Sequence, residues 1–303
     1  MKARSWGVRS WLERPQVAGY VFILPWILGF LAFQVIPIVV SFWLSFTSYK
    51  VVSEPVWIGL DNFTRMFFED ELFWKSVLVT LLFVFVSVPL RLLFGLLVAV
   101  LLNRETKPAG VYRSLVYLPS LVGGSVVVAV LWKELFGING ALNSLLGIVG
   151  LNTGFSWIGD PSSALWVLVS LSVWQFGSSM LIFVAGLKQI PVTYYEAARC
   201  DGASAFRQFR QITLPLLTPI IFFNLIMTVI SSFMAFTSAY IITGGGPMDS
   251  TLFYVLYMYQ RAFKWFEMGY SSAMAWVLLV VMGAATALIF KSSSKWVYYE
   301  AKE

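Results

Sequence analysis

The chain contains six stretches that are long and apolar enough to cross a lipid bilayer. A helix needs about 20 apolar residues to span the hydrocarbon core, and buried helices of soluble proteins rarely run so far without a charge. Five of the six contain no charged residue, and the second contains only Arg91. The stretches are Val17–Phe46, Ser76–Leu102, Ser114–Trp132, Ala164–Leu187, Leu216–Ile242 and Ser271–Phe290. We therefore predict an all-α membrane protein with about six transmembrane helices.

The composition agrees with a lipid environment. The 303 residues are 59% hydrophobic and 12% charged, with a mean hydropathy of +0.79. A soluble globular domain carries about 25% charged residues. Basic residues precede the first stretch as in a secretory signal, but its uncharged run reaches Tyr49 without a small-residue cleavage site. We expect this first helix to be retained.

The basic residues predict how the chain is oriented. Six crossings place both termini on one side, and the segments on that side hold 14 of the 21 Lys and Arg residues, against six on the other. Cytoplasmic loops carry the excess of Lys and Arg, so both termini are predicted to be cytoplasmic. The net charge of +6 is then a consequence of topology and no sign of nucleic-acid binding.

The residues that most enzymes need are missing. The chain has no histidine and one cysteine, Cys200, which excludes disulfide frameworks, Cys/His metal sites and His-dependent catalytic triads. It also contains no Gly-Lys dipeptide and hence no Walker A loop. We expect no catalytic residues, metal or bound cofactor. Any ATP and Mg that drive this chain would bind to another polypeptide.

Arg91 is the one charged residue inside the six stretches. Proton-coupled carriers use carboxylates or histidines at membrane depth, and arginine does not titrate usefully. Two interpretations stay open. Arg91 contacts cargo or a gate, or it is a helix-packing or snorkelling residue beside Pro89, which is the more common role of a long basic side chain.

The segment between the fourth and fifth stretches reads as two short helices. Thr193 and Glu196 form a capping-box pattern that begins the first helix. Gly202 allows the turn that ends it, and Ser204 can cap the second. We therefore expect residues 191–215, called the knob below, to project into the cytoplasm as a compact helix-turn-helix.

The knob carries three motifs in order, which are Glu196-Ala197-Ala198, Asp201-Gly202-Ala203 and Ile212-Thr213-Leu214-Pro215. This order resembles the "EAA" loop of binding-protein-dependent ABC importer permeases. Further motifs resemble the carbohydrate branch of that family, the maltose and glycerol-phosphate type. They include Leu24-Pro25, Gly59-Leu60-Asp61-Asn62-Phe63, Tyr117-Leu118-Pro119, Thr243-Gly244-Gly245-Gly246-Pro247 and Met268-Gly269-Tyr270. Arg91 departs from the family pattern, in which an apolar residue is expected.

The resemblance implies a type I ABC importer permease fold in a bacterial or archaeal cell (inner) membrane. It implies four kinds of partner: a second permease subunit, two ATPase subunits that hold ATP and Mg, an extracellular or periplasmic solute-binding protein, and a carbohydrate substrate. It assigns contact with the ATPases to the knob, through Glu196, Ala197, Ala198, Asp201, Gly202 and Ala203.

The same resemblance divides the chain into four parts. Residues 1–15 are expected to form a cytoplasmic tail and 16–48 the first transmembrane helix. Residues 74–290 form the five-helix permease core, with the EAA loop at 191–215, and 291–303 form a second cytoplasmic tail.

Two of the stretches carry polar side chains on one face, where cargo could bind. Such residues must find partners in the bundle interior or a wet cavity. Hydroxyls and amides beside aromatic rings suit sugars. The resemblance places sugar contacts near Ser172, Gln175, Ser179, Thr228, Ser231 and Ser232. The candidates are Ser172, Trp174, Gln175, Ser179, Asn224, Thr228, Ser231 and Ser232. The alternative is that these hydroxyls bond to their own helix carbonyls or allow close helix packing.

Two other classes of function remain as alternatives. A stand-alone secondary carrier would use the knob only for assembly. A membrane enzyme such as a lipid-modifying transferase is disfavoured by the absence of histidine and of clustered carboxylates inside the stretches.

Overall fold

The computed structural model describes residues 15–103, 109–151 and 154–298. The predicted N-terminal tail therefore lies outside the described residues except for Pro15, whereas the predicted C-terminal tail is described up to residue 298 and its first residues belong to the helix that ends at Ser293. Among the described residues, five helices are long and apolar enough to cross a membrane, or six if one sharply bent pair counts as a single span. They are Gly19–Leu44, Glu71–Leu102, Ala164–Leu187, Ala205–Phe233 and Met268–Ser293, with Gly110–Val122 and Val126–Leu135 as the bent pair. The predicted helical membrane fold is confirmed.

Three of the predicted stretches are not continuous helices, and the fourth divides at Gln175 and Phe176 into α9 (Ala164–Trp174) and α10 (Gly177–Leu187). The third divides into α6 (Ala109–Val122) and α7 (Val126–Leu135), which meet at 95°. The break falls at Gly123-Gly124, where two residues without side chains let the backbone turn. The fifth was predicted to reach Ile242, but α13 (Leu214–Phe233) ends at Phe233 and a separate π-helical turn, η3 (Ala239–Thr243), follows.

The described residues form two compact units. The first lies within Met1–Met66 and Arg261–Val277, and the second within Phe67–Gln260 and Leu278–Glu303. In the first unit, the apolar helix consists of α2 (Pro15–Phe30), η1 (Leu31–Val35) and α3 (Ile36–Leu44). A short hairpin of β1 (Thr47–Ser48) and β2 (Val56–Trp57) follows, and then α4 (Asp61–Phe68).

A hydrogen-bonded and charged cluster holds the first unit together. The Asn62 side-chain amide donates to the carbonyl oxygens of Ser45 and Thr47, both at 2.9 Å. Glu267 pairs with Arg65 and with Arg261, each at 3.0 Å. Because one carboxylate accepts from two guanidinium groups that are also held over aromatic rings, the cluster fixes the hairpin region to the start of α15.

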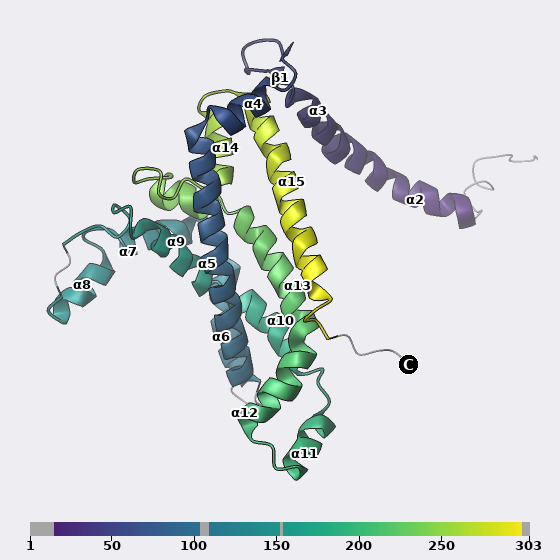
Figure 1. Cartoon of the computed structure of the whole chain (residues 1–303), viewed down its shortest axis with the longest axis vertical. Coiled ribbons are helices and arrows are strands. Elements are labelled where there is room, and N and C mark those ends of the chain that lie inside the picture. Colours follow the sequence, from purple (N-terminus) through teal and green to yellow (C-terminus); the bar gives the residue numbers. More distant parts are fainter. Residues whose placement is uncertain (1–14, 104–108, 152–153, 299–303) are drawn as a thin grey trace, which may run out of the picture. The chain divides into compact units, whose positions relative to one another are not determined.

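The second unit is a helical bundle built around α5 (Glu71–Leu102), as Figure 1 shows. This helix packs against α9 (Ala164–Trp174), α10 (Gly177–Leu187) and α13, and α10 also packs against α6. A buried apolar cluster lies where these helices cross, formed by Ala99, Met180, Phe183, Val184, Leu187, Ile190 and Leu217. The remaining elements are α8 (Ala141–Ile148), α11 (Val192–Cys200), α12 (Ala205–Gln208), η2 (Phe209–Thr213), α14 (Tyr254–Phe263) and α15 (Met268–Ser293).

Glycines let the helices of this bundle approach closely. A β-carbon at Gly95 would lie 3.3 Å from the amide nitrogen of Met180, and one at Gly177 would lie 2.8 Å from the carbonyl oxygen of Val116. At Gly186 the neighbour is the side chain of Ile220, at 2.9 Å. Small residues at crossings are expected in membranes, where helix association depends on close packing rather than on exclusion of water.

Two π-helical turns precede prolines inside long helices. The turn η1 leads to Pro37 and η2 leads to Pro215, and each closes with a hydrogen bond from the residue just before that proline. Proline lacks an N–H and collides with the carbonyl four residues earlier. One wider turn before it relieves that conflict, so the helix continues past the proline.

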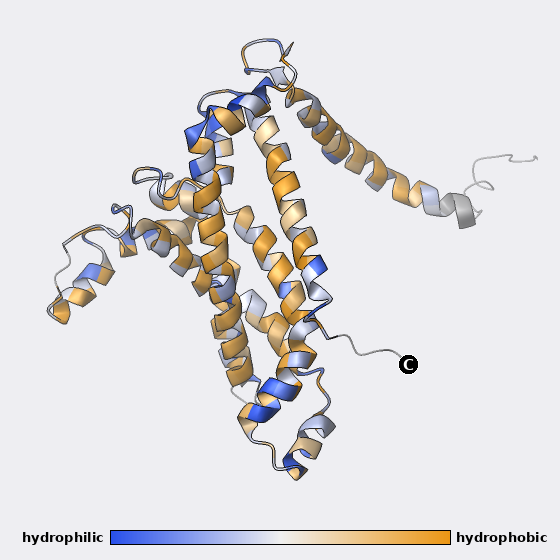
Figure 2. Cartoon of the chain, in the orientation of Figure 1, coloured by the Kyte–Doolittle hydropathy of each residue, from blue (hydrophilic) through white to orange (hydrophobic). Residues whose placement is uncertain are grey.

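The surface of the bundle follows the hydropathy of a membrane protein. Figure 2 shows apolar residues along most of α5, α13 and α15, and hydrophilic residues gathered at α11 and α12. Many large apolar side chains on these spans are exposed, including Leu78, Phe85 and Leu279. In a bilayer such side chains contact lipid, so exposing them does not carry the free-energy cost that exposing them to water would carry.

Helix α15 offers a matched test of the first unit. A β-carbon at Gly269 would overlap the carbonyl oxygen of Thr47 and lie 3.0 Å from the amide nitrogen of Tyr49, whereas one at Gly283 has open space. We predict that Gly269→Ala lowers the thermal unfolding temperature of the detergent-solubilised protein, because the clash costs about 1–3 kcal/mol. Gly283→Ala should be neutral or stabilising, because alanine favours a helix by up to about 1 kcal/mol. Equal unfolding temperatures for both variants would contradict the packing described.

Candidate functional site

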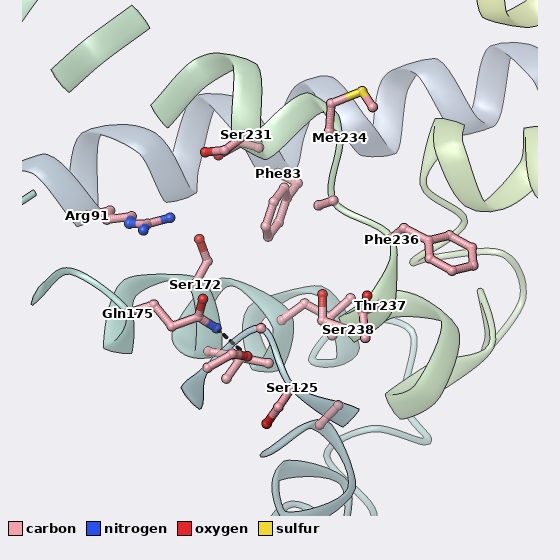
Figure 3. A pocket seen from close by; sticks show the side chains of 17 residues that line it. Phe83, Arg91, Ser125, Ser172, Gln175, Ser231, Met234, Phe236, Thr237 and Ser238 are labelled. Carbon is pink, nitrogen blue, oxygen red and sulfur yellow. Dashed lines mark hydrogen bonds between the residues drawn. The ribbon is translucent and has the colours of Figure 1, made fainter. Parts of the chain in front are cut away.

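A cavity of about 340 Å³ opens in the second unit where several helices are interrupted. Its wall is formed by α5, by the break between α6 and α7, by α9 near its end, and by the segment that follows α13 (Figure 3). This volume lies near the lower end of the range of small-molecule sites. The cavity is thus the first candidate for a binding site.

The lining is polar for a site inside an apolar bundle. Hydroxyls, one amide and one guanidinium alternate with two aromatic rings. These residues are Ser125, Ser172, Ser231, Ser232, Thr237, Ser238, Gln175, Arg91, Phe83 and Phe236. Most of them lie where a helix ends rather than in its middle. A site of this kind can hydrogen-bond a polyhydroxylated molecule and pack rings against it.

Two hydrogen-bonding side chains hold the helix breaks together. The Gln175 amide donates to the carbonyl oxygen of Gly123 at 3.0 Å. The Ser120 hydroxyl donates to the carbonyl oxygen of Gln175 at 2.8 Å and accepts from the amide of Ser178 at 3.1 Å. Residues at each break therefore hydrogen-bond to backbone carbonyl groups that the other break leaves without helical partners. Backbone groups inside a membrane need such partners within the protein.

Four of the predicted substrate residues line the cavity, namely Ser172, Gln175, Ser231 and Ser232. The Ser231 hydroxyl also donates to the carbonyl oxygen of Thr228 at 2.9 Å. The Gln175 side-chain amide donates to the Gly123 carbonyl oxygen. Their contact with cargo stays a prediction.

The other four predicted residues lie outside the cavity wall. The Trp174 ring packs on that of Trp132, with 5.1 Å between centroids. Asn224 and Ser179 are buried, and the Asn224 amide donates to the Ser179 carbonyl oxygen at 3.5 Å. Thr228 is buried as well. In this conformation the Trp174 and Asn224 side chains connect neighbouring helices, and the contact of all four residues with cargo stays a prediction.

The sequence reasoning overlooked the wall residues that lie outside regular helices. We assumed that the third and fifth stretches were continuous helices, so the prediction did not include Ser125, Phe236, Thr237 and Ser238. The adjacent Gly123-Gly124 pair was the available signal of a break.

Arg91 lies in the cavity wall. Among the described lining residues it is the one ionisable group. In Figure 3 its side chain extends from α5 toward the space between Ser172 and Ser231. The buried Nε atom has no hydrogen-bond partner among the described residues. Of the two interpretations left open by the sequence, this geometry favours contact with a ligand or gate.

The knob is a helix-turn-helix, as predicted. Gly202 has a φ of +72°, the left-handed conformation that glycine adopts freely. The Ser204 hydroxyl accepts from the amide of Arg207 and so caps α12. The predicted capping box at Thr193 is wrong, because α11 begins after Pro191 without a side-chain cap. Proline fixes φ near the helical value and orders that end without a capping hydroxyl.

The surface of the knob is mostly polar but exposes large apolar side chains, among them Val192 and Phe206. Glu196 and Asp201 are exposed, and Phe206 is 73% exposed. A groove of about 330 Å³ separates α12 from the ends of α5 and α10, lined by Asn103 and Arg199 among others. Tyr195 and Thr213 join their hydroxyls at 2.9 Å and tie α11 to the start of the span that contains α13. Movement of the knob would therefore pull directly on that span.

Comparison with known proteins identifies this architecture. Residues 72–298 match the family described as "Binding-protein-dependent transport system inner membrane component". The chain belongs to this family of ABC importer permeases. The match begins at α5 and ends beyond α15, so it includes both the cavity and the knob.

Two curated relatives and one solved structure are similar to this permease over most of its length. It is 57% identical over 294 residues to the probable ABC transporter permease protein YesP of Bacillus subtilis, covering 96% of this chain and 95% of the relative. It is 37% identical over 254 residues to the trehalose/maltose transport system permease protein MalF of Thermococcus litoralis, covering 83% and 84%. A bacterial alginate ABC transporter, solved in complex with an alginate pentasaccharide-bound periplasmic protein, has a chain with TM-score 0.80 and 22% identity, covering 94% and 97%. The last comparison establishes the fold.

The chain is therefore a multi-pass membrane permease subunit of an ABC importer. The family assignment agrees with the expected type I importer fold.

The glycine pair at the α6–α7 break provides a test of the cavity wall. A β-carbon at Gly123 would overlap the Gln175 side chain and lie 2.7 Å from the Pro119 carbonyl oxygen, whereas one at Gly124 has open space. We predict that Gly123→Ala displaces Gln175, loses a hydrogen bond worth about 0.5–1.5 kcal/mol and lowers the unfolding temperature. Gly124→Ala is the matched control and should retain the wild-type unfolding temperature. A Gly123→Ala protein as stable as that control would show that this contact does not hold the break.

Proposed function

We propose that this chain is one of two permease subunits of an ATP-driven importer of sugars or oligosaccharides. The observation that carries the proposal is the polar cavity at the helix breaks, in a chain that belongs to the importer permeases. The 37% identical relative, a trehalose/maltose permease, supports a carbohydrate cargo.

The cavity would form this chain's half of the translocation pathway. Ser172, Ser231 and Ser232 would hydrogen-bond sugar hydroxyls, and Phe83 and Phe236 would offer ring faces. The second permease would supply the other wall. An extracellular or periplasmic solute-binding protein would deliver the cargo.

Energy would enter through the knob. In this proposal the exposed residues Glu196 and Asp201 contact an ATPase subunit, while Gly202 sets the angle between α11 and α12. The small side chains of Ala197, Ala198 and Ala203 would let the ATPase subunit approach the knob closely. Two ATPase subunits would hold ATP and Mg, and this chain would bind no cofactor of its own.

Helix α13 would carry the movement to the cavity. Its 20 residues follow the knob directly and end beside Ser231 and Ser232, a distance of about 30 Å at roughly 1.5 Å per residue. ATP must bind the closed ATPase pair more tightly than the open pair for this coupling to work. The span would then rock the cavity between inward-facing and outward-facing states.

The topology of the proposal follows the basic residues. The knob and both termini would face the cytoplasm, in agreement with the excess of Lys and Arg on that side. The hydrophilic end of the second unit at α11 and α12 would then be the cytoplasmic end.

Substitutions at Gly202 test the coupling role of the knob. A β-carbon has open space there, but a β-branched residue such as valine resists a positive φ, whereas asparagine tolerates it. We predict that Gly202→Val abolishes ATP-dependent sugar uptake by the reconstituted transporter and weakens co-purification of the ATPase subunits. Gly202→Asn should retain most of both.

Glu196→Ala tests the surface without changing the turn, since Glu196 is exposed. We predict loss of uptake with normal membrane insertion, measured in membrane vesicles that contain the whole complex. Normal ATP-dependent uptake by Gly202→Val and Glu196→Ala would refute the coupling role. Uptake that follows an ion gradient in the isolated chain would instead support a secondary carrier.

A further inference from the structure

The cavity carries a positive charge that nothing in the described part of the chain balances. Its described lining holds no Asp or Glu, and the ion pairs of the described residues involve Arg65, Lys75 and Arg261 rather than Arg91. The buried Nε of Arg91 makes no hydrogen bond among the described residues.

The position of Arg91 makes this charge costly. At about 1.5 Å per residue it lies roughly 16 Å along α5 from Leu102, where the helix ends. Ser87, one turn earlier on the same face, also has a buried hydroxyl without a partner among the described residues. A charge at membrane depth is usually paired or functional. The free guanidinium here faces a hydroxyl-lined cavity rather than another helix (Figure 3).

We propose that Arg91 binds a carboxylate of the cargo, so that this transporter imports acidic oligosaccharides that contain uronic acid. The inference rests on the proposed function and deepens it. The planar guanidinium matches a carboxylate with two parallel hydrogen bonds. A single arginine also balances one carboxylate, whereas a phosphate monoester carries about −1.5 to −2 charges and would stay partly unbalanced.

Sugar hydroxyls would then complete the site. Ser172 and Ser231 lie on either side of the Arg91 side chain and can hydrogen-bond the ring that carries the carboxylate (Figure 3). Arg91 would thus act as the specificity-determining residue, and the serines would hold any sugar without regard to charge.

The test measures equilibrium binding of sugars to the assembled permease and ATPase complex without the solute-binding protein, whose own selectivity is thereby excluded. The probes are disaccharides in which a single galacturonate, glucuronate or mannuronate residue is joined to a neutral sugar, each beside its neutral methyl ester. We expect the wild type to bind at least one uronate tenfold or more tighter than its ester, a difference of ~1.4 kcal/mol. Arg91→Gln should reduce that ratio to about one, and Arg91→Lys should keep part of it.

Arg113→Gln is the matched control. The Arg113 guanidinium donates to the carbonyl oxygen of Leu102 and lies outside the cavity wall, so this variant should keep the wild-type ratio. A wild-type ratio near one, or an unchanged ratio in Arg91→Gln, would overturn the inference. Equal weakening of acid and ester in Arg91→Gln leaves the ratio unchanged, so it would also overturn the inference, because Arg91 would then support the site without recognising the carboxylate.

The outcomes separate this inference from the proposed function. Binding of neutral sugars with ATP-dependent uptake, and no effect of Arg91, would overturn the acidic cargo and leave the sugar importer standing. Failure of every sugar to bind or to be taken up would overturn both. Tighter binding of a phosphorylated disaccharide than of any uronate would overturn the carboxylate assignment.

Discussion

The architecture depends on one constraint, that backbone N–H and C=O groups inside a membrane must find hydrogen-bond partners within the protein. This chain interrupts its helices after Val122, after Trp174 and after Phe233. The Ser120 hydroxyl donates to the Gln175 carbonyl oxygen, and the Gln175 side chain donates to the Gly123 carbonyl oxygen, so the backbone can leave the helical path at two of these breaks without facing lipid. The polar cavity occupies the space that these breaks open.

The same arrangement connects the cavity to the knob through two helices. The knob is continuous with α13, and α13 ends at the cavity wall. On its other side, α10 leads from the α9–α10 break to the knob, and its residues Phe183 and Leu187 pack in the buried cluster with Leu217 of α13. Because this cluster is closely packed, the proposed displacement of the knob would move both helices together instead of being absorbed between them.

Sequence patterns predicted the helices well and the breaks poorly. Long uncharged runs such as Ser76–Leu102 identify a span because few other structures tolerate them, and the turn at Gly202 followed from its αL preference. Apolar periodicity gave no warning that the run ending at Ile242 divides at Phe233, since the broken segment is just as apolar. The polar stripe on α13 was equally ambiguous: Ser231 faces the cavity, while Asn224 joins two helices. Only the packing of neighbouring helices separates these roles.

The central claim is that energy from nucleotide hydrolysis enters this chain through the knob. Cys200, the single cysteine of the chain, is exposed at the end of α11 and provides a natural probe. The decisive measurement is crosslinking from Cys200 with a short thiol-reactive reagent in native membranes, with and without ATP. The account predicts a crosslink to a nucleotide-hydrolysing subunit whose yield changes when ATP binds. Absence of any such crosslink, or labelling of Cys200 by an impermeant reagent added outside intact cells, would contradict it.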